Sequence, residues 1–157
     1  MDIGKDLGAL LITNPTNIRY LTGFVGVAEN EREAYSLLTR DSLYFFTSAL
    51  YIESARNVKC PTRLPDGQVP NVQRKLVEFS REEPFAKKLK EILDPISRNR
   101  NAKVGFDEDD LKVSEYNTFS KVLKGITLIP TKNRIEKVRM IKREDEIDNI
   151  REAARFN

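Results

Sequence analysis

Short apolar runs alternate with helical patterns along most of this chain of 157 residues. Each run has the length of a strand, and most of the segments between runs carry apolar residues on one helical face. The predicted strands are 9–13, 35–39, 43–47, 58–62, 76–79, 103–107 and 126–130, and the predicted helices are 14–23, 48–57, 84–96 and 114–124. This alternation predicts an α/β, three-layer domain with a mixed β-sheet flanked by helices.

The direction of the predicted strands follows from their connections. Residues 35–39 and 43–47 are joined only by Arg40, Asp41 and Ser42, and a connection this short forces an antiparallel hairpin. The later runs are separated by whole helices, which permit parallel neighbours. The sheet is therefore expected to be part antiparallel and part parallel.

Local signals mark the ends of the predicted helices. Asn14 can cap the first helix, Pro15 suits its first position, and Gly23 suits its end. Ser48 is predicted to cap the second helix, and Pro95 to end the third. The residues expected to face inward in the third and fourth helices are Phe85, Leu89, Ile92, Leu93, Ile96, Tyr116, Phe119, Val122 and Leu123.

Length and composition indicate a soluble globular protein with one domain and a tail. The chain is 39% hydrophobic and 32% charged, and it contains no run of eighteen apolar residues. Its start carries Asp and Lys rather than the pattern of a signal peptide, so we expect a cytoplasmic protein and no membrane partner. Cys60 is the only cysteine, which excludes an internal disulfide.

The last 26 residues carry a sharp charge pattern. Cations dominate from Lys132 to Arg143, and four acids follow within the next five residues. Because cations suit helix carboxyl ends and anions suit amino ends, we expect a helix break at 142–144. The apolar stripe beyond the break needs a partner, so this segment either folds back or connects to another domain. The formal charge of +3 is small, and no aromatic residues are interleaved for nucleic-acid stacking.

The chain offers little material for catalysis. It contains no histidine, and no Ser-Lys motif nominates a nucleophile with a base. The acids at 107–110 could form a hard-cation site, but adjacent acids at a strand end alternate faces, and a solvated loop is the simpler interpretation. The glycines at 23 and 26 lack the context of a phosphate loop.

Several segments, in this order, resemble the amino-terminal domain of the creatinase/prolidase family of pita-bread metallopeptidases. The matching segments are N-P-T-N-I-R-Y-L-T-G-F (14–24), Y-S-L-L-T (35–39), L-Y-F-F-T (43–47), V-G-F-D (104–107) and the helical stretch 134–154. The resemblance implies a ribonuclease H-like fold over residues 1–131 and a connector helix over 132–157. The long charged loop at 25–34 and the Pro-rich stretch at 60–70 depart from the family pattern.

The resemblance also implies a function. In Xaa-Pro aminopeptidases and dipeptidases this domain is non-catalytic, supports a homodimer, and precedes a catalytic domain that holds two divalent metal ions (manganese, cobalt or zinc). No cofactor is expected in this chain itself. We expect the 24–34 loop to limit the length of proline-containing peptides, with Arg32 binding a peptide carboxylate and Phe24 lining an apolar proline pocket.

Two alternatives remain open at this point. Relatives of this fold include catalytically silent modules that bind proteins such as histones, and the basic stretch 132–143 also permits a nucleic-acid partner. A creatinase-like amidinohydrolase shares the same front domain.

Overall fold

The computed structural model of the protein describes residues 6–26, 32–58, 72–97, 102–142 and 144–155. Within these ranges the strands form one six-stranded sheet in the order β4-β3-β2-β1-β5-β6. The strands are β1 (Ala9–Ile12), β2 (Ala34–Thr39), β3 (Ser42–Ser48), β4 (Gln73–Phe79), β5 (Lys103–Asp107) and β6 (Thr127–Thr131). The predicted antiparallel hairpin is confirmed as β2 and β3.

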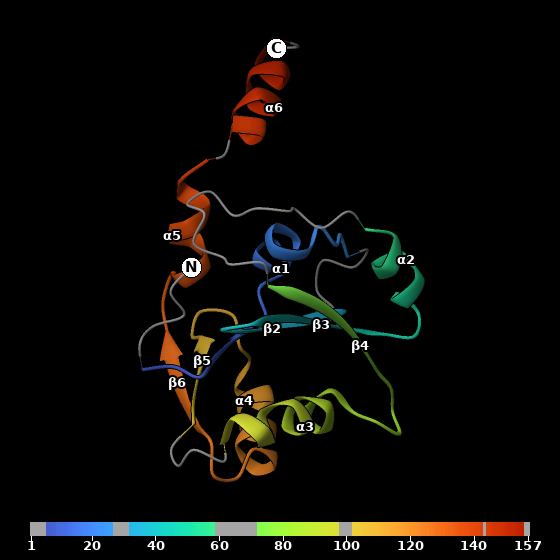
Figure 1. The fold of residues 1–157 in the computed structure, drawn as a ribbon, viewed down its shortest axis with the longest axis vertical. Helices are drawn as coiled ribbons and strands as arrows, with labels where there is room; N and C mark the ends of the chain where they lie inside the picture. Colours follow the sequence, from blue (N-terminus) through green and yellow to red (C-terminus); the bar gives the residue numbers. More distant parts are fainter. Residues whose placement is uncertain (1–5, 27–31, 59–71, 98–101, 143, 156–157) are drawn as a thin grey trace.

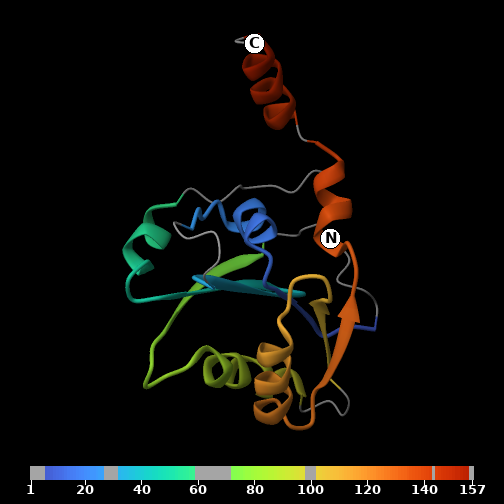
Figure 2. The same cartoon turned by 180° about the vertical axis from the view of Figure 1, so that it is seen from behind.

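The helices lie on both faces of this sheet, as Figures 1 and 2 show. They are α1 (Pro15–Thr22), α2 (Ile52–Asn57), α3 (Phe85–Ser97), α4 (Val113–Val122), α5 (Arg134–Met140) and α6 (Glu144–Arg155). Helices α1, α2 and α5 cover one face, α3 and α4 cover the other, and α6 stands apart from the body. The three-layer α/β prediction is confirmed. So is the helix break, since α5 ends at Met140 and α6 begins at Glu144.

The sheet is mixed, as predicted. β1 pairs with β2 antiparallel and with β5 parallel, β5 pairs with β6 parallel, and β3 pairs with β4 parallel. The strands β1, β5 and β6 therefore form a parallel half, in which Leu11 lies opposite Phe106 and Phe106 lies opposite Pro130.

Two hydrophobic cores fill the spaces between the sheet and its helix layers. Alternate residues of a strand point to opposite faces, so Leu11 joins the core beneath α3 and α4 while Leu10 and Ile12 join the core beneath α1 and α5. The four residues of β1 are all buried, which fits a central strand covered on both faces. None of the helices in the described ranges is long and apolar enough to span a bilayer.

Helix α1 has the ends that the sequence predicts. The Asn14 side chain accepts hydrogen bonds from the N–H groups of Thr16 (3.0 Å) and Asn17 (3.1 Å), and Pro15 occupies the first turn. Gly23 closes the helix with φ 77°, and its N–H donates to Arg19 O at 2.7 Å. The cap thus fixes the position of Asn17 in the first turn of α1.

Two predicted helix boundaries are wrong. Ser48 is the last residue of β3 rather than a cap, and α2 begins at Ile52 without a side-chain capping bond. Pairing with β4 extends β3 through Ser48, so sheet pairing overrides the local capping tendency. Pro95 lies inside α3, which continues to Ser97. Near a helix end proline removes only one backbone bond, and the buried face of α3 compensates for that loss.

Tyr116 was predicted to face inward but is 39% exposed. Helix α4 packs on the core through Phe119 and the following Leu123, both buried. Tyr116 sits nearer the start of α4, where its ring lies beside the Phe106 ring with centroids 5.5 Å apart. Burial in α4 thus increases toward its carboxyl end, and a residue on the apolar face near the amino end is still partly exposed.

The strand predicted at 76–79 begins earlier, at Gln73. Its first residues are polar and pair with Ser42, Leu43 and Tyr44 of β3, so backbone pairing rather than an apolar pattern defines them. The extended segment predicted at 58–62 and the surface excursion at 64–72 fall mostly on 59–71, outside the described residues, as does Cys60.

Gly105 is expected to be intolerant of any side chain. A Cβ atom there would lie 2.8 Å from Leu7 Cδ1, 3.0 Å from Leu10 Cδ1 and 3.1 Å from Thr131 Cγ2. Gly105→Ala should therefore lower the free energy of unfolding by about 1–3 kcal/mol through overpacking. Chemical denaturation measures the change, and Ser120→Ala on the exposed face of α4 serves as the control. Equal stability of the two variants would contradict this packing.

Candidate functional site at the carboxyl edge of the sheet

The parallel half of the sheet gathers polar residues at one edge. Strands β1, β5 and β6 run parallel, so Thr13, Asp107 and Thr131 all lie at their carboxyl ends. Strand β2 is antiparallel to β1, and its first residues therefore enter from the same edge, directly after Arg32. In open α/β sheets this edge is where ligands usually bind. The polar residues at this edge are therefore candidates for a functional site.

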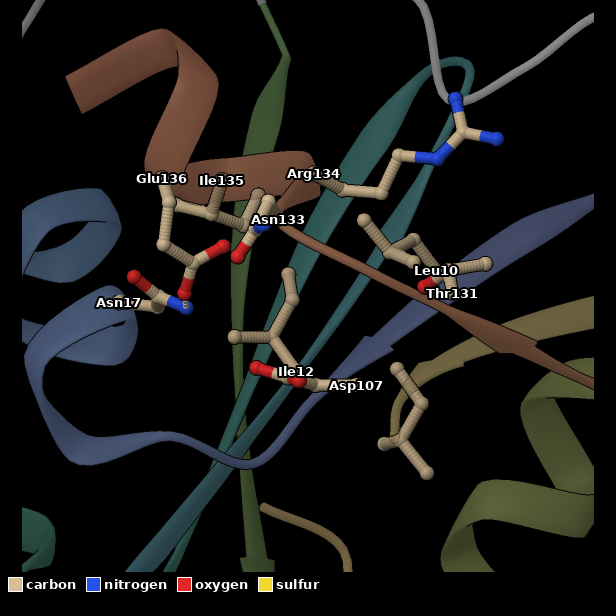
Figure 3. A pocket seen from close by; sticks show the side chains of 10 residues that line it. Leu10, Ile12, Asn17, Asp107, Thr131, Asn133, Arg134, Ile135 and Glu136 are labelled. Atoms are coloured by element: carbon tan, nitrogen blue, oxygen red, sulfur yellow. Dashed lines mark hydrogen bonds between the residues drawn. The ribbon is translucent and has the colours of Figure 1, made fainter. Parts of the chain in front are cut away.

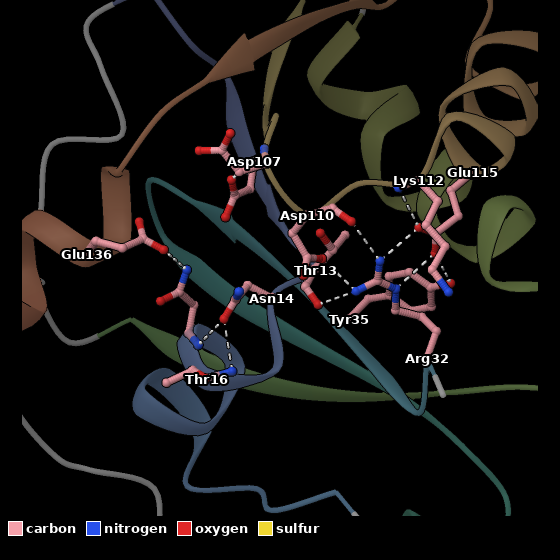
Figure 4. Close-up of polar contacts among 12 residues, drawn as sticks. Thr13, Asn14, Thr16, Arg32, Tyr35, Asp107, Asp110, Lys112, Glu115 and Glu136 are labelled. Atoms are coloured by element: carbon pink, nitrogen blue, oxygen red, sulfur yellow. Dashed lines mark hydrogen bonds and ion pairs between the residues drawn. The ribbon is translucent and has the colours of Figure 1, made fainter. Parts of the chain in front are cut away.

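Arg32 forms the most densely bonded polar cluster at this edge (Figure 4). Its Nε and Nη2 donate to the two oxygens of Glu115 at 3.0 and 2.9 Å, a bidentate pair. Its Nη1 donates to Asp110 Oδ2 at 2.6 Å and to Thr13 O at 2.7 Å. A further bond joins Nη2 to Asp110 O at 3.1 Å. The cluster thus ties the entry to β2 to the end of β1 and to the start of α4.

The cluster is largely shielded from water, which strengthens the attraction between its opposite charges. The side chains of Arg32, Asp110 and Glu115 are 15%, 19% and 14% exposed. Burial alone would raise the pKa of Glu115, but hydrogen bonds from Arg32 and from the Lys112 N–H, with the charge of Arg32, lower it. Tyr35 donates its hydroxyl to Glu115 at 3.0 Å, and burial together with the Glu115 charge raises the pKa of Tyr35.

Arg32 uses its full hydrogen-bonding capacity inside the domain. A guanidinium has five N–H donors, and the five bonds to Glu115, Asp110 and Thr13 match that number. A peptide carboxylate could bind Arg32 only by displacing one of these partners. The substrate contact expected of Arg32 stays a prediction, and the bidentate geometry on which it rested is already formed with Glu115.

Phe24, the second residue expected at a substrate pocket, lies in the core beneath α1 and α2. It is 3% exposed, and its ring packs against Phe45 and Tyr51 with centroids 5.2 and 6.1 Å apart. Phe24 thus lies in an apolar core, whereas Arg32 lies in the ion-paired cluster at the sheet edge. Residues 27–31 between them lie outside the described residues. The role of Phe24 in lining a proline pocket likewise stays a prediction.

The acids at 107–110 separate into different environments. Asp110 joins Arg32, whereas Glu108 and Asp109 lie 3.6 and 3.7 Å from the Lys132 ammonium. The pKa of Asp107 is raised by burial and, to a smaller extent, by the negative charges of Glu136, Asp110 and Asp109. A hydrogen bond from the Asp109 N–H opposes this rise. Across the described part of the chain, no three His, Cys, Asp or Glu side chains are grouped to hold a metal ion. The residues that the structure describes therefore offer no ligand set for a dinuclear metal centre.

A small pocket lies between α1, α5 and the same sheet edge (Figure 3). Asn17 is one of the lining residues. Its Nδ2 donates to Glu136 Oε1 at 2.5 Å, and its Oδ1 accepts from Arg139 Nη1 at 2.9 Å. The pocket volume is about 10 Å³, roughly the space that one water molecule requires. It is far below the volume of a small-molecule site.

A larger groove lies beside β6. Its volume is about 530 Å³, and its lining includes Asp6, Leu7, Ile129, Pro130 and Thr131. Its basic side chains are Lys103, Lys132, Arg134 and Lys137. The sequence identified the cations at 132–137 as a basic stretch, and the fold adds Lys103 from the neighbouring strand. The groove is the strongest concentration of positive charge around any described pocket.

Sequence reasoning missed most partners in these clusters. Glu115 and Asp110 lie 83 and 78 residues from Arg32, and Glu136 lies 119 residues from Asn17. A local signal was available for Glu115. It lies three residues after Lys112, where a glutamate side chain can accept a hydrogen bond from the Lys112 N–H at the start of a helix. That signal predicts a helix start and says nothing of Arg32.

Comparison with known proteins gives a consistent result. The family model described as Creatinase/Prolidase N-terminal domain matches residues 4–141. The peptidase YqhT of Bacillus subtilis (strain 168) is 28% identical over 150 residues, which cover 96% of this chain and 36% of that protein.

Solved structures share the fold. A Xaa-Pro dipeptidase from Bacillus anthracis matches with a TM-score of 0.69 and 23% identity, over 90% of this chain and 34% of that one. A Xaa-Pro aminopeptidase from Streptococcus pyogenes matches with a TM-score of 0.62 and 27% identity, over 84% of both chains. The chain thus spans about a third of the length of the B. subtilis and B. anthracis relatives.

Proposed function

Because the chain belongs to the Creatinase/Prolidase N-terminal domain family, we propose that it is the non-catalytic front domain of a Xaa-Pro aminopeptidase or dipeptidase. The observation that carries the proposal is the family match over residues 4–141, together with peptidase relatives about three times as long. In this proposal residues 1–131 form the domain, and 132–157 form a connector toward a catalytic domain. The relatives named above are peptidases, which favours this function over a creatinase-like amidinohydrolase.

In the proposed protein, hydrolysis of the bond before proline takes place in the catalytic domain. Two divalent metal ions, manganese, cobalt or zinc, would be held there and would supply the activated water. The present chain has no histidine, and the acids Glu108, Asp109, Asp110 and Glu115 pair with cations of the domain itself. Its own contribution is to support the catalytic domain and a homodimer, and to restrict which proline-containing peptides reach the active site. The cytoplasmic location stays a prediction.

The apolar residues exposed around α5 and α6 support the connector role. Met140, Ile141 and Ile150 expose more than half of their surface, although each is a large apolar residue. Exposed apolar residues close together in one segment are typical of a surface that another domain covers. We propose that the catalytic domain of the same polypeptide covers them.

The substrate-limiting role of Arg32 gives the proposal a kinetic test. In the longer protein, Arg32→Ala is expected to raise KM for dipeptides about tenfold while changing kcat less, because a charge-assisted bond to the substrate is lost. Glu115→Gln is the matched control, since it disturbs the same cluster but keeps the guanidinium. An unchanged KM in Arg32→Ala would remove the proposed contact. Equal increases in both variants would show that Arg32 acts only through the domain's structure.

The basic groove beside β6 favours a second candidate function, a catalytically silent binding module. Four cations and one acid, Asp6, line the groove, and Glu108 and Asp109 pair with Lys132. The cations Lys103, Arg134 and Lys137 leave the groove suited to an acidic protein segment or a nucleic-acid backbone. Titration of a labelled DNA duplex with the protein at increasing salt tests whether the groove binds nucleic acid. A steep loss of affinity with salt supports phosphate contacts, and absence of binding at moderate salt dismisses them. Lys103→Glu with Lys137→Glu should abolish any binding that uses this groove.

A further inference from the structure

The Asn17 side chain joins α1 to α5 from a position that water hardly reaches. Asn17 is 1% exposed, and its amide is shared between two residues of α5. It donates to Glu136 near the start of that helix and accepts from Arg139 near its end. Figure 3 shows Asn17 beside Glu136 between the two helices. One short side chain thus contacts α5 at positions nearly one turn apart.

The chemistry of this contact requires an amide. A carboxylate can only accept hydrogen bonds and a guanidinium can only donate them, so the residue between Glu136 and Arg139 must do both. Asparagine does this in the space available. Aspartate would face Glu136 with a second negative charge, and leucine would leave both partners unpaired.

Both ends of the contact are held in place by other interactions. On the α1 side, Asn14 Oδ1 accepts from the Asn17 N–H, so the helix cap fixes where the amide begins. On the α5 side, Ile135 is 2% exposed in the core beneath α1, next to Glu136 in the sequence. The apolar anchor sets the distance between the helices, and the two bonds to Asn17 set the rotation of α5 about its axis.

We infer that Asn17 is a positioning residue that fixes the direction in which the chain leaves the domain through α5. This inference rests on the proposed function, in which α5 and α6 lead to the catalytic domain. If α5 is held in one orientation, the catalytic domain is held in one orientation relative to the front domain. Asn17 touches no substrate in this account and acts only through Glu136 and Arg139.

Hydrogen exchange in the 157-residue protein tests the inference without any peptide substrate. Asn17→Leu should increase the exchange rates of α5 amides about tenfold, while α3 amides, on the opposite face, stay within about twofold of the wild type. Asn17→Asp should have the same effect, because the new carboxylate repels Glu136. In Glu136→Gln alone, the α5 amides should exchange at the wild-type rates, since the glutamine oxygen still accepts a hydrogen bond from Asn17.

A double variant separates this positioning role from general damage to the fold. In Asn17→Asp with Glu136→Gln, the amide at 136 donates to the carboxylate at 17, and Arg139 donates to it as well. Exchange at α5 should return to within about twofold of the wild type. Unchanged exchange in Asn17→Leu, or failure of the double variant to restore protection, would overturn the inference. Since no peptide cleavage is measured, the result is independent of whether the proposed peptidase function holds.

Discussion

Arg32→Met is expected to lower the free energy of unfolding by about 3–5 kcal/mol, because the carboxylates of Asp110 and Glu115 then stay buried without a counter-charge. Methionine keeps most of the length of the side chain, so the loss comes from charge and hydrogen bonds rather than volume. The backbone oxygen of Thr13 also loses its donor. Urea denaturation of the 157-residue protein at pH 7 measures the change.

A surface arginine provides the matched control. Arg56 pairs with Glu53 at 3.2 Å, but the two side chains are 62% and 73% exposed. Arg56→Met should therefore change stability by no more than about 0.5 kcal/mol. If Arg32→Met lowers the free energy of unfolding no more than this control does, the buried ion pairs of Arg32 contribute little to stability.

The cost of losing Arg32 should depend on pH. The pKa of Glu115 is lowered in the folded protein, so the stability it contributes is fully present above its ordinary pKa of 4.5 and is lost as the pH falls through its folded value. Without Arg32, burial would instead raise this pKa, and protonation in acid would relieve the unpaired charge. The stability gap between wild type and Arg32→Met should therefore be widest near pH 7 and should narrow below pH 4.5. A gap that is constant across this range would contradict the electrostatic explanation.

Phe85→Ala is expected to have an effect of similar size, about 3–5 kcal/mol, for a different reason. Phe85 is the first residue of α3, and its ring lies among four other rings. It stacks on Tyr35 with centroids 3.7 Å apart and meets Phe46, Phe119 and Phe79 edge-on at 5.0, 5.5 and 6.0 Å. Removing it opens a cavity between the sheet and both helices of that layer and also deletes aromatic pair contacts.

The control for this truncation is Leu50→Ala, because Leu50 is 79% exposed and fills no core. Its stability should change by no more than about 0.5 kcal/mol. Guanidinium denaturation of both variants should show a lower midpoint for Phe85→Ala with an unchanged m value, which marks lost stability rather than a different unfolded state. Comparable midpoints for Phe85→Ala and Leu50→Ala would show that the Phe85 ring contributes little to the stability of the core.

The parts of the fold that the sequence predicts well are those that local chemistry decides. Asn14, Pro15 and Gly23 act on backbone groups within a few residues, and the structure places α1 between them as expected. The β2–β3 hairpin follows from its short connection. The apolar run of β1 predicts a strand covered on both faces, and all four of its residues are buried. In each case the deciding contacts are close in the sequence.

Predictions failed where distant contacts override local tendencies. Ser48 would suit a helix cap, yet pairing with β4 keeps it in β3. Pro95 would suit a helix end, yet the packed face of α3 carries the helix past it to Ser97. The cluster around Arg32 is the extreme case, since its acidic partners lie about eighty residues away and leave no periodic signal. Such pairs become visible only when the sheet brings their elements together.

The candidate site itself has a consistent physical character. At the carboxyl edge, where α/β proteins usually leave room for ligands, this domain places Arg32, Asp110 and Glu115, whose charges pair with one another. Arg32 has five bonds to its own chain, and the pocket beside Asn17 has room for about one water molecule. We interpret this edge as a support, to which α5 is joined by the hydrogen bonds of Asn17.

The most direct test of this account is a peptidase assay on the 157-residue protein. The purified protein is incubated with manganese, cobalt or zinc and with Xaa-Pro dipeptides and longer proline peptides. A full-length Xaa-Pro dipeptidase at the same concentration serves as the positive control. We predict no product above the protein-free blank for this chain. Hydrolysis that follows the protein through successive chromatography steps, and that a chelator abolishes, would contradict the assignment of a non-catalytic front domain.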